Sequence, residues 1–166
     1  MRKLRISLLH LAPVLGDIDG NRKLVESALE VAAEQGADWA VTPELCIPGY
    51  LFVEKIGTDW ILPQPDPWMK DICRQVKRSS MTVFMAHPDR DPKTQELYNT
   101  VFVIDPSGTI IGQHSKIKTL RGPEAWSSPG TDCTPVNCSG LEVGILVCAD
   151  SYKNDVPQMF KDRGAD

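Results

Sequence analysis

The chain has 166 residues, of which 42% are hydrophobic, with a formal net charge of −4 and a pI of about 5.4. This length and composition suit one globular domain with a hydrophobic core, so we interpret residues 1–166 as a single domain. The acidic balance argues against a nucleic-acid-binding protein, which would carry a basic face. The sequence has no run of about 18 apolar residues, so we expect neither a membrane span nor a membrane partner.

The first half of the chain alternates apolar segments of strand length with segments of helical periodicity. Residues 4–11 form the first predicted strand; we prefer this to a signal peptide because Ser7 and His10 interrupt the apolar run and Pro13 closes it. A helix follows, with apolar residues at helical spacing up to Gly36. The next predicted elements are a strand at 39–42, a structured loop as far as Pro67, a helix at 67–78 and a strand at 81–86.

The second half begins with the clearest turn in the sequence. Residues 105–108 read DPSG, the pattern of a type I turn, and predict a hairpin of strands 97–104 and 109–113. Residues 118–139 are expected to be a loop. A strand at 141–147 and a helix at 155–163 complete the predicted elements. Strands and helices that alternate in this way predict a layered α/β fold.

Five cysteines occur at irregular spacings, without a Cys-x-x-Cys pair. We therefore expect no zinc or other metal site, and no motif indicates a cofactor. Without a secretory signal, the cysteines are interpreted as reduced thiols, which indicates a cytoplasmic location. Four of them are expected to be small buried hydrophobic residues, namely Cys46, Cys73, Cys133 and Cys138.

Three chemically active residues each follow a predicted strand. Glu44 follows the second strand, Lys116 follows the hairpin and Cys148 follows the strand at 141–147. If these ends meet in a cleft, Glu44 can take the thiol proton, the thiolate can attack a carbonyl or nitrile carbon, and Lys116 can stabilise the developing charge. Lys118 is an alternative to Lys116, although the spacing from Gly112 favours Lys116.

Four motifs in this order resemble the nitrilase, or carbon-nitrogen hydrolase, superfamily. The first is PELCIPGY at residues 43–50, and the second is the lysine after a glycine-centred strand in GQHSK at 112–116. The third is a glutamate ahead of Pro-Gly in PEAWSSPG at 123–130, and the fourth is GILVCAD at 144–150. Together the motifs cover nearly the whole chain and correspond to the N-terminal two-thirds of that family's domain.

The resemblance implies an αββα sandwich with a Cys-Glu-Lys triad. Cys148 then corresponds to the nucleophile, Glu44 to the general base and Lys116 to the residue that stabilises the tetrahedral intermediate. Glu124 matches an additional glutamate that positions the substrate and the triad, and the backbone N–H of Ala149 would complete the oxyanion site. The implied reaction is hydrolysis of a non-peptide C–N bond in an amide or carbamoyl-type small molecule through a thioester acyl-enzyme.

The chain departs from the family pattern in sequence and in length. It has His114 and Ser115 where relatives often carry aromatic and arginine residues, and the segment after Cys148 also differs. The last third of the family's domain has no counterpart, and the ending Gly-Ala-Asp repeats the Gly-Ala-Asp at 36–38 that precedes a strand. We therefore expect a sandwich truncated before its C-terminal strands, with exposed apolar surface and marginal stability, and a homo-oligomer in the complete form.

Three alternatives to a free-standing amidase were weighed. The chain could be the glutaminase module of a longer amidotransferase or synthetase. It could also be a catalytically incompetent fragment that serves as an interaction module. A papain-like Cys-His enzyme would need a histidine beside Cys148, and no local signature places His10, His87 or His114 there.

Overall fold

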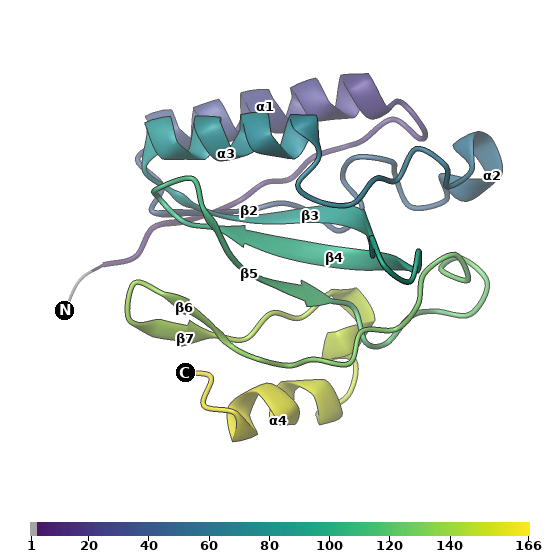
Figure 1. Ribbon diagram of the computed structural model, residues 1–166. Coiled ribbons are helices and arrows are strands. Elements are labelled where there is room, and N and C mark those ends of the chain that lie inside the picture. The colour runs from purple at the N-terminus through teal and green to yellow at the C-terminus, as the bar shows by residue number, and fades with distance from the viewer. Residues whose placement is uncertain (1–2) are drawn as a thin grey trace.

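The computed structural model describes residues 3–166, which form stacked layers of helices and strands. In Figure 1, helices α1 and α3 lie on one face of a five-stranded sheet, the hairpin β6–β7 lies on the opposite face, and helix α4 lies outside that hairpin. The order of the layers is helices, sheet, sheet, helix, which is the order expected for an αββα sandwich. The described part of the second sheet has two strands.

The five-stranded sheet is parallel at one side and antiparallel at the other. Strands β1, β2 and β3 are parallel because α1 and α3 carry the chain back across the same face each time. Strands β3, β4 and β5 are antiparallel neighbours joined by hairpins. The strands are β1 (Ile6–Leu8), β2 (Trp39–Val41), β3 (Thr82–Arg90), β4 (Leu97–Ile104), β5 (Ile110–Ser115), β6 (Val136–Cys138) and β7 (Leu141–Val143).

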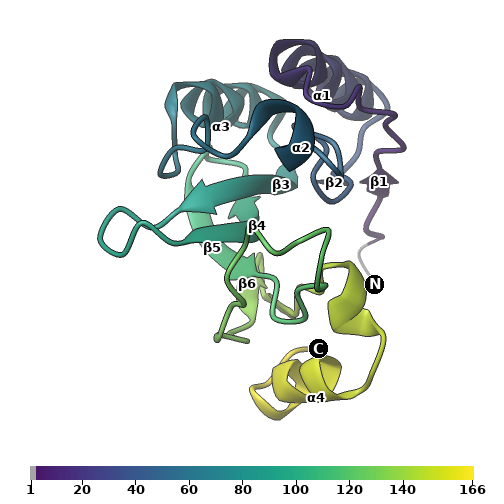
Figure 2. The same ribbon diagram turned by 90° about the vertical axis from the view of Figure 1, so that its right-hand side faces the viewer.

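Side-chain caps set where the two long helices begin. Asp17 accepts a hydrogen bond from the N–H of Gly20 at the start of α1, and Asp66 accepts one from Met69 at the start of α3. Figure 2 shows α1 and α3 side by side on the sheet. No helix within residues 3–166 is both long and apolar enough to cross a bilayer. The helices are α1 (Ile18–Glu34), α2 (Val53–Ile56), α3 (Pro67–Ser79) and α4 (Asp155–Asp162), with a 3₁₀ helix at Cys148–Ser151.

Three predicted strands differ from the observed ones by three residues or more in length. Strand β1 is shorter than the predicted 4–11 because it pairs only with the three residues of β2. Strand β3 is longer than predicted and reaches Arg90, because β4 pairs with it along its full length. Strand β7 ends at Val143 instead of residue 147, because its partner β6 is only three residues long.

Strand β6 and helix α2 were not predicted as separate elements. Strand β6 lies inside the segment 118–139 that was expected to be a loop, and its buried–exposed–buried pattern covers only three residues. Helix α2 has only four residues; Val53 and Ile56 pack against the buried cluster of Leu45, Phe52 and Ile61, but a single turn is too short to give a periodic signal. Strand β6 forms a tight hairpin with β7, in which the turn residues Ser139 and Gly140 both have positive φ.

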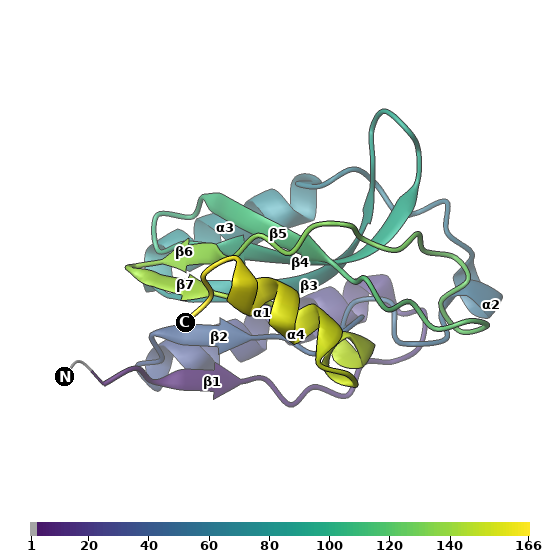
Figure 3. The same cartoon turned by 90° about the horizontal axis from the view of Figure 1, so that it is seen from below.

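An apolar groove of about 340 Å³ lies between the five-stranded sheet and the segment after β7. Its walls include Trp39, Val41 and Phe84 from the sheet and Ile145 and Leu146 from the opposite side. In Figure 3, β6 and β7 lie over the β3–β5 side of the sheet and leave β1 and β2 uncovered on that face. Two side chains of β1 on the groove are consequently exposed, at 47% for Ile6 and 76% for Leu8.

The two Gly-Ala-Asp segments adopt the same hydrogen-bonded junction. Gly36 and Gly164 both have positive φ and donate to the carbonyl three residues earlier, while Ala37 and Ala165 donate to the carbonyl five residues earlier. Each aspartate then forms two hydrogen bonds with the backbone of one residue in a neighbouring segment. Asp38 N donates to Arg5 O (2.9 Å) and accepts from Arg5 N (2.8 Å); Asp166 N donates to Glu142 O (2.9 Å) and accepts from Glu142 N (2.8 Å).

His87 makes folding sensitive to acid. The ring is 1% exposed and lies between Trp60 and Trp68, and burial lowers the pKa of His87 to about 4, against a weaker opposing effect of the carbonyl of Pro88. The unfolded chain takes up this proton near pH 6.5, before the folded chain does. The free energy of unfolding should therefore fall by roughly 1.4 kcal/mol per unit as the pH drops from 6.5 to 4.

Urea unfolding at several pH values, followed by circular dichroism, checks this expectation. We expect the free energy of unfolding of His87→Phe to change less with pH between 6.5 and 4 than that of the wild type. The control His10→Gln should show the wild-type pH dependence, since His10 is exposed. An equal slope in wild-type and His87→Phe protein would show that His87 is not responsible.

The exposed apolar wall of the groove should cause self-association. We expect Leu8→Glu to reduce the association of the 166-residue chain, because it places a charge on the uncovered face. Val31→Glu is the matched control: Val31 is 56% exposed on α1, away from the groove. Sedimentation velocity over a range of concentrations measures the effect. Equal self-association of Leu8→Glu and Val31→Glu, or a wild-type chain that is monomeric, would contradict the expectation.

Candidate active site

Glu44 enters the site from a sharp turn after β2. The next residue, Leu45, has φ of +50° and is buried, so the chain reverses there and Gly49 N donates to Leu45 O (2.9 Å). The side chain of Glu44 remains 17% exposed. It lines the end of the apolar groove, next to Cys148.

Lys116 follows β5 directly and is fully buried. Its backbone is fixed on both sides, because Lys116 N donates to Asn99 O (2.8 Å) and Gly130 N donates to Lys116 O (2.8 Å). The ammonium donates to Glu44 Oε1 (2.7 Å) and to both carboxylate oxygens of Glu124 (2.7 and 2.8 Å). Burial lowers the pKa of Lys116, but the hydrogen bonds to Glu124 and Glu44 more than offset this and raise it, so the side chain is a cation.

The rival lysine, Lys118, lies outside this cluster. It is 42% exposed and forms an ion pair with Asp155. The structure thus brings Glu44, Lys116 and Glu124 together and excludes Lys118 from the set.

Asn99 on β4 also belongs to the cluster, although the sequence analysis did not identify it. Its side-chain N–H₂ donates to Glu44 Oε1 (2.8 Å) and to Glu124 Oε1 (3.0 Å), and the residue is 1% exposed. The sequence feature that could have indicated Asn99 is its position just before residues 101–104, the apolar part of a buried strand. Buried polar groups usually have a partner; the N–H₂ of Asn99 bridges the two carboxylates, whereas no donor within residues 3–166 bonds to its buried Oδ1.

Glu124 is more fully bonded than Glu44. It accepts from Lys116, from Asn99 and from Leu120 N (2.8 Å), and it is fully buried. Glu44 receives its hydrogen bonds on Oε1, and within residues 3–166 no donor faces Oε2. Of the two carboxylates, Glu44 therefore has an oxygen available to accept a proton.

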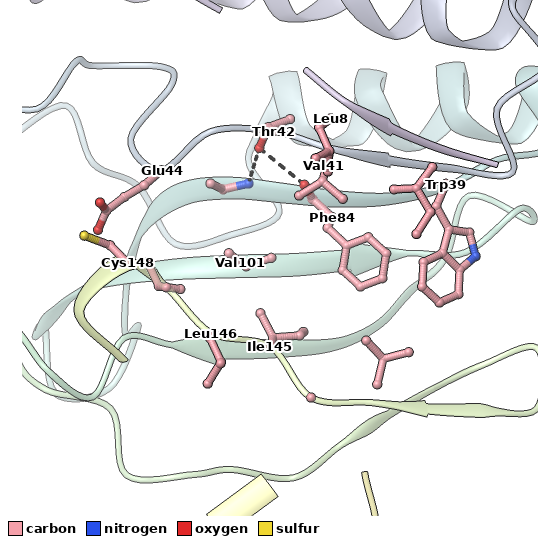
Figure 4. Close-up of a pocket in the computed structure, with 15 residues that line it drawn as sticks. Leu8, Trp39, Val41, Thr42, Glu44, Phe84, Val101, Ile145, Leu146 and Cys148 are labelled. Atoms are coloured by element: carbon pink, nitrogen blue, oxygen red, sulfur yellow. Dashed lines mark hydrogen bonds between the residues drawn. The ribbon is translucent and has the colours of Figure 1, made fainter. Parts of the chain in front are cut away.

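Cys148 is the first residue of the 3₁₀ helix and has φ of +46°. Residues other than glycine adopt this backbone conformation at a cost in free energy. The residue is exposed. In Figure 4 its sulfur and the carboxylate of Glu44 point toward each other at one end of the groove. Ala149 is the second residue of the same turn, where backbone N–H groups have no partner within the helix.

Tyr152 lies against the thiol, and it was not singled out from the sequence. Its hydroxyl lies 3.6 Å from Cys148 Sγ, and this contact raises the pKa of Tyr152. Partial burial, followed by the charge of Glu124, raises the pKa of Tyr50. The phenol of Tyr152 is therefore near the place where a substrate would meet the thiol.

A thiol facing a carboxylate that is itself bound to a buried ammonium is the arrangement of a cysteine hydrolase. Comparison with known families agrees with the class: the model of the carbon-nitrogen hydrolase family matches residues 5–166. The chain belongs to the carbon-nitrogen hydrolase family.

Relatives in this family are longer than this chain. A glutamine-dependent NAD(+) synthetase of Thermotoga maritima is 30% identical over 92% of the chain, which spans 26% of that protein. A nitrilase of Pyrococcus abyssi is 24% identical over 98% of the chain and 62% of its own length. A solved amidase from Nesterenkonia sp. has a TM-score of 0.81 at 23% identity, over 98% of this chain and 62% of its own; at that identity it shows the fold alone.

Removing the ammonium should destabilise the fold. We expect Lys116→Met to lower the free energy of unfolding by about 3–5 kcal/mol, because it leaves the buried carboxylate of Glu124 without a counter-charge. The matched control, Lys118→Met, should change it by less than about 0.5 kcal/mol, since that side chain is partly exposed. Urea unfolding of the two variants is the measurement. Similar stability of the Lys116 and Lys118 variants would contradict the assigned cluster.

Proposed function

We propose that this chain carries the catalytic residues of a hydrolase that cleaves the C–N bond of an amide or carbamoyl-type small molecule. The observation that supports this most strongly is the uncommitted oxygen of Glu44 beside the thiol of Cys148, with Glu44 held by Lys116. A base must be within reach of the thiol because an ordinary cysteine is mostly protonated at neutral pH.

The proposed reaction has two halves. Glu44 takes the proton of Cys148, and the thiolate attacks the substrate carbonyl carbon to form a tetrahedral oxyanion. Lys116 and the N–H of Ala149 stabilise that charge. Glu44 then gives its proton to the leaving nitrogen, the C–N bond breaks, and ammonia or an amine departs from the thioester. Water, deprotonated by Glu44, hydrolyses the thioester and restores the thiol.

Glu124 has a positioning role in this proposal. It takes two hydrogen bonds from Lys116 and therefore fixes the direction of the ammonium. Because one ammonium is shared by two carboxylates, the cluster of three charges keeps a formal net negative charge.

A second candidate is the glutaminase module of a larger synthetase. The supporting observation is the NAD(+) synthetase relative, of which the chain matches 26%. In that case the substrate is L-glutamine and the released ammonia is used elsewhere in the larger protein. The chemistry at Cys148 is the same in both candidates, so the choice between them depends on the substrate.

We also propose a cytoplasmic location and self-association of the complete enzyme. All five cysteines are free thiols in the structure, which suits a reducing compartment. The exposed apolar groove supports association, because such a surface is normally covered by another segment or subunit.

The covalent step is tested by mass spectrometry of the intact chain with acetamide, N-carbamoylglycine or L-glutamine, together with assays of released ammonia. We expect an acyl adduct on wild-type protein, and we expect Cys148→Ala to lose the adduct and at least roughly 10³-fold in rate. Cys73→Ala is the control, since Cys73 lies on α3 away from the site. Turnover of glutamine alone favours the glutaminase module.

Near wild-type turnover by Cys148→Ala would exclude covalent catalysis by this residue. Absence of any adduct or ammonia from the wild-type chain with all three compounds would favour the non-catalytic alternative.

A further inference from the structure

Asp150, two residues after the cysteine, accepts hydrogen bonds from two separate segments. The residue is fully buried. Its Oδ1 accepts from Ile117 N (3.1 Å) and Lys118 N (2.8 Å), and its Oδ2 lies 3.1 Å from the donor Val147 N and 3.0 Å from His114 Nε2. One carboxylate is therefore bonded to four donors.

These bonds surround both Lys116 and Cys148. Lys116 lies between His114 and Ile117, and Cys148 lies between Val147 and Asp150. The carboxylate therefore joins the chain segment that carries the ammonium to the segment that carries the thiol. We call this set of bonds the Asp150 clamp.

The clamp also closes the turn in which Cys148 has a positive φ. Val147 N donates to Asp150 Oδ2, and Asp150 N donates in return to Val147 O (3.0 Å). A strained residue keeps its conformation only when its surroundings determine it. The two reciprocal bonds span Cys148 and supply that restraint.

His114 is the side chain that holds Asp150 from the opposite segment. It is 3% exposed, its Nδ1 lies 3.1 Å from the carbonyl oxygen of Asp132, and its ring packs edge-on against Phe160 of α4. Burial raises the pKa of Asp150, but the hydrogen bonds from His114, Lys118 and Val147 outweigh it and lower the pKa below its ordinary value. Asp150 is therefore a carboxylate, which accepts from all four donors.

We propose that Asp150, oriented by His114, is a positioning residue that holds the turn of Cys148 against the segment of Lys116. The inference rests on the proposed role of Cys148 as the nucleophile. Without the clamp the turn relaxes, and the thiol leaves the position in which it faces Glu44.

Alkylation of Cys148 by iodoacetamide reports the position of the thiol and needs no turnover. Peptide mapping by mass spectrometry follows Cys148 separately from the other four cysteines. We expect Asp150→Asn to slow alkylation of Cys148 by roughly tenfold or more, because a displacement of about 1 Å is enough to lose the activating geometry. The amide group that replaces one oxygen faces two donors and cannot accept from them.

Two controls separate positioning from general loss of stability. Asp155→Asn changes an exposed aspartate near the same turn, and Val156→Ala removes buried volume beside Phe160 but leaves the clamp bonds in place. Both should alkylate within twofold of the wild-type rate, although Val156→Ala should melt at a lower temperature. A wild-type rate in Asp150→Asn, or an equal slowing in Val156→Ala, would overturn the proposal.

A pair of histidine variants tests the orienting role and serves if Asp150→Asn does not fold. His114→Gln keeps an N–H donor that can face Asp150, whereas His114→Phe keeps a ring and loses the donor. We expect the glutamine variant to alkylate faster than the phenylalanine variant. Equal rates would remove His114 from the clamp.

The alkylation series and the turnover assays fail independently. If Cys148→Ala retains turnover, the proposed function is wrong whatever the alkylation rates. If the wild-type chain shows no turnover and Asp150→Asn still slows alkylation, the clamp holds the turn and the proposed reaction is absent.

Discussion

The fold around the site depends on one buried ammonium shared by two carboxylates. Lys116 donates to Glu44 and Glu124, which come from the turn after β2 and from the loop after β5, and Asn99 of β4 joins the same group. Taking three charges out of water is costly, and the hydrogen bonds from Lys116 and Asn99 to the two carboxylates offset that cost. The same pairing fixes three separate segments relative to one another.

The cysteine lies on a different layer from this charge cluster, so the site depends on how the layers are held together. Cys148 follows the segment after β7, whereas Asn99 is on β4 and Lys116 directly follows β5 of the five-stranded sheet. Apolar packing of Phe84 and Val103 with Val136, Cys138 and Ile145 brings the two sheets together but gives no direction to a side chain at the site. Polar contacts supply that direction at the site: the hydrogen bonds of Asp150 on one side and the ion pairs of Lys116 on the other.

The sequence alone predicted the long elements for physical reasons, and it pointed to the candidate site residues. The helices at 18–34 and 67–79 have capping aspartates and a continuous apolar face, and the DPSG turn determines the β4–β5 hairpin. Family motifs pointed to Glu44, Lys116, Glu124 and Cys148, and the structure brings the first three into contact. Strand β6 was not predicted because its three residues give no periodic pattern, although its partner β7 is close in sequence. The bonds of Asn99 to the two carboxylates and of Asp150 to the segment 114–118 were not predictable, because these partners are more than 20 residues away. No local pattern marks such partners.

The positive φ of Cys148 lowers the stability of the fold at the residue proposed to carry the nucleophile. Glycine adopts this conformation freely, whereas an L side chain is strained there by roughly 1–2 kcal/mol. The residue that would best suit the backbone is thus one that has no thiol. Selection for a more stable chain would favour replacing the cysteine, whereas the role of nucleophile proposed for Cys148 would require its sulfur to be kept. A glycine at position 148 in a related sequence would therefore mark a lineage that kept the fold and gave up the reaction.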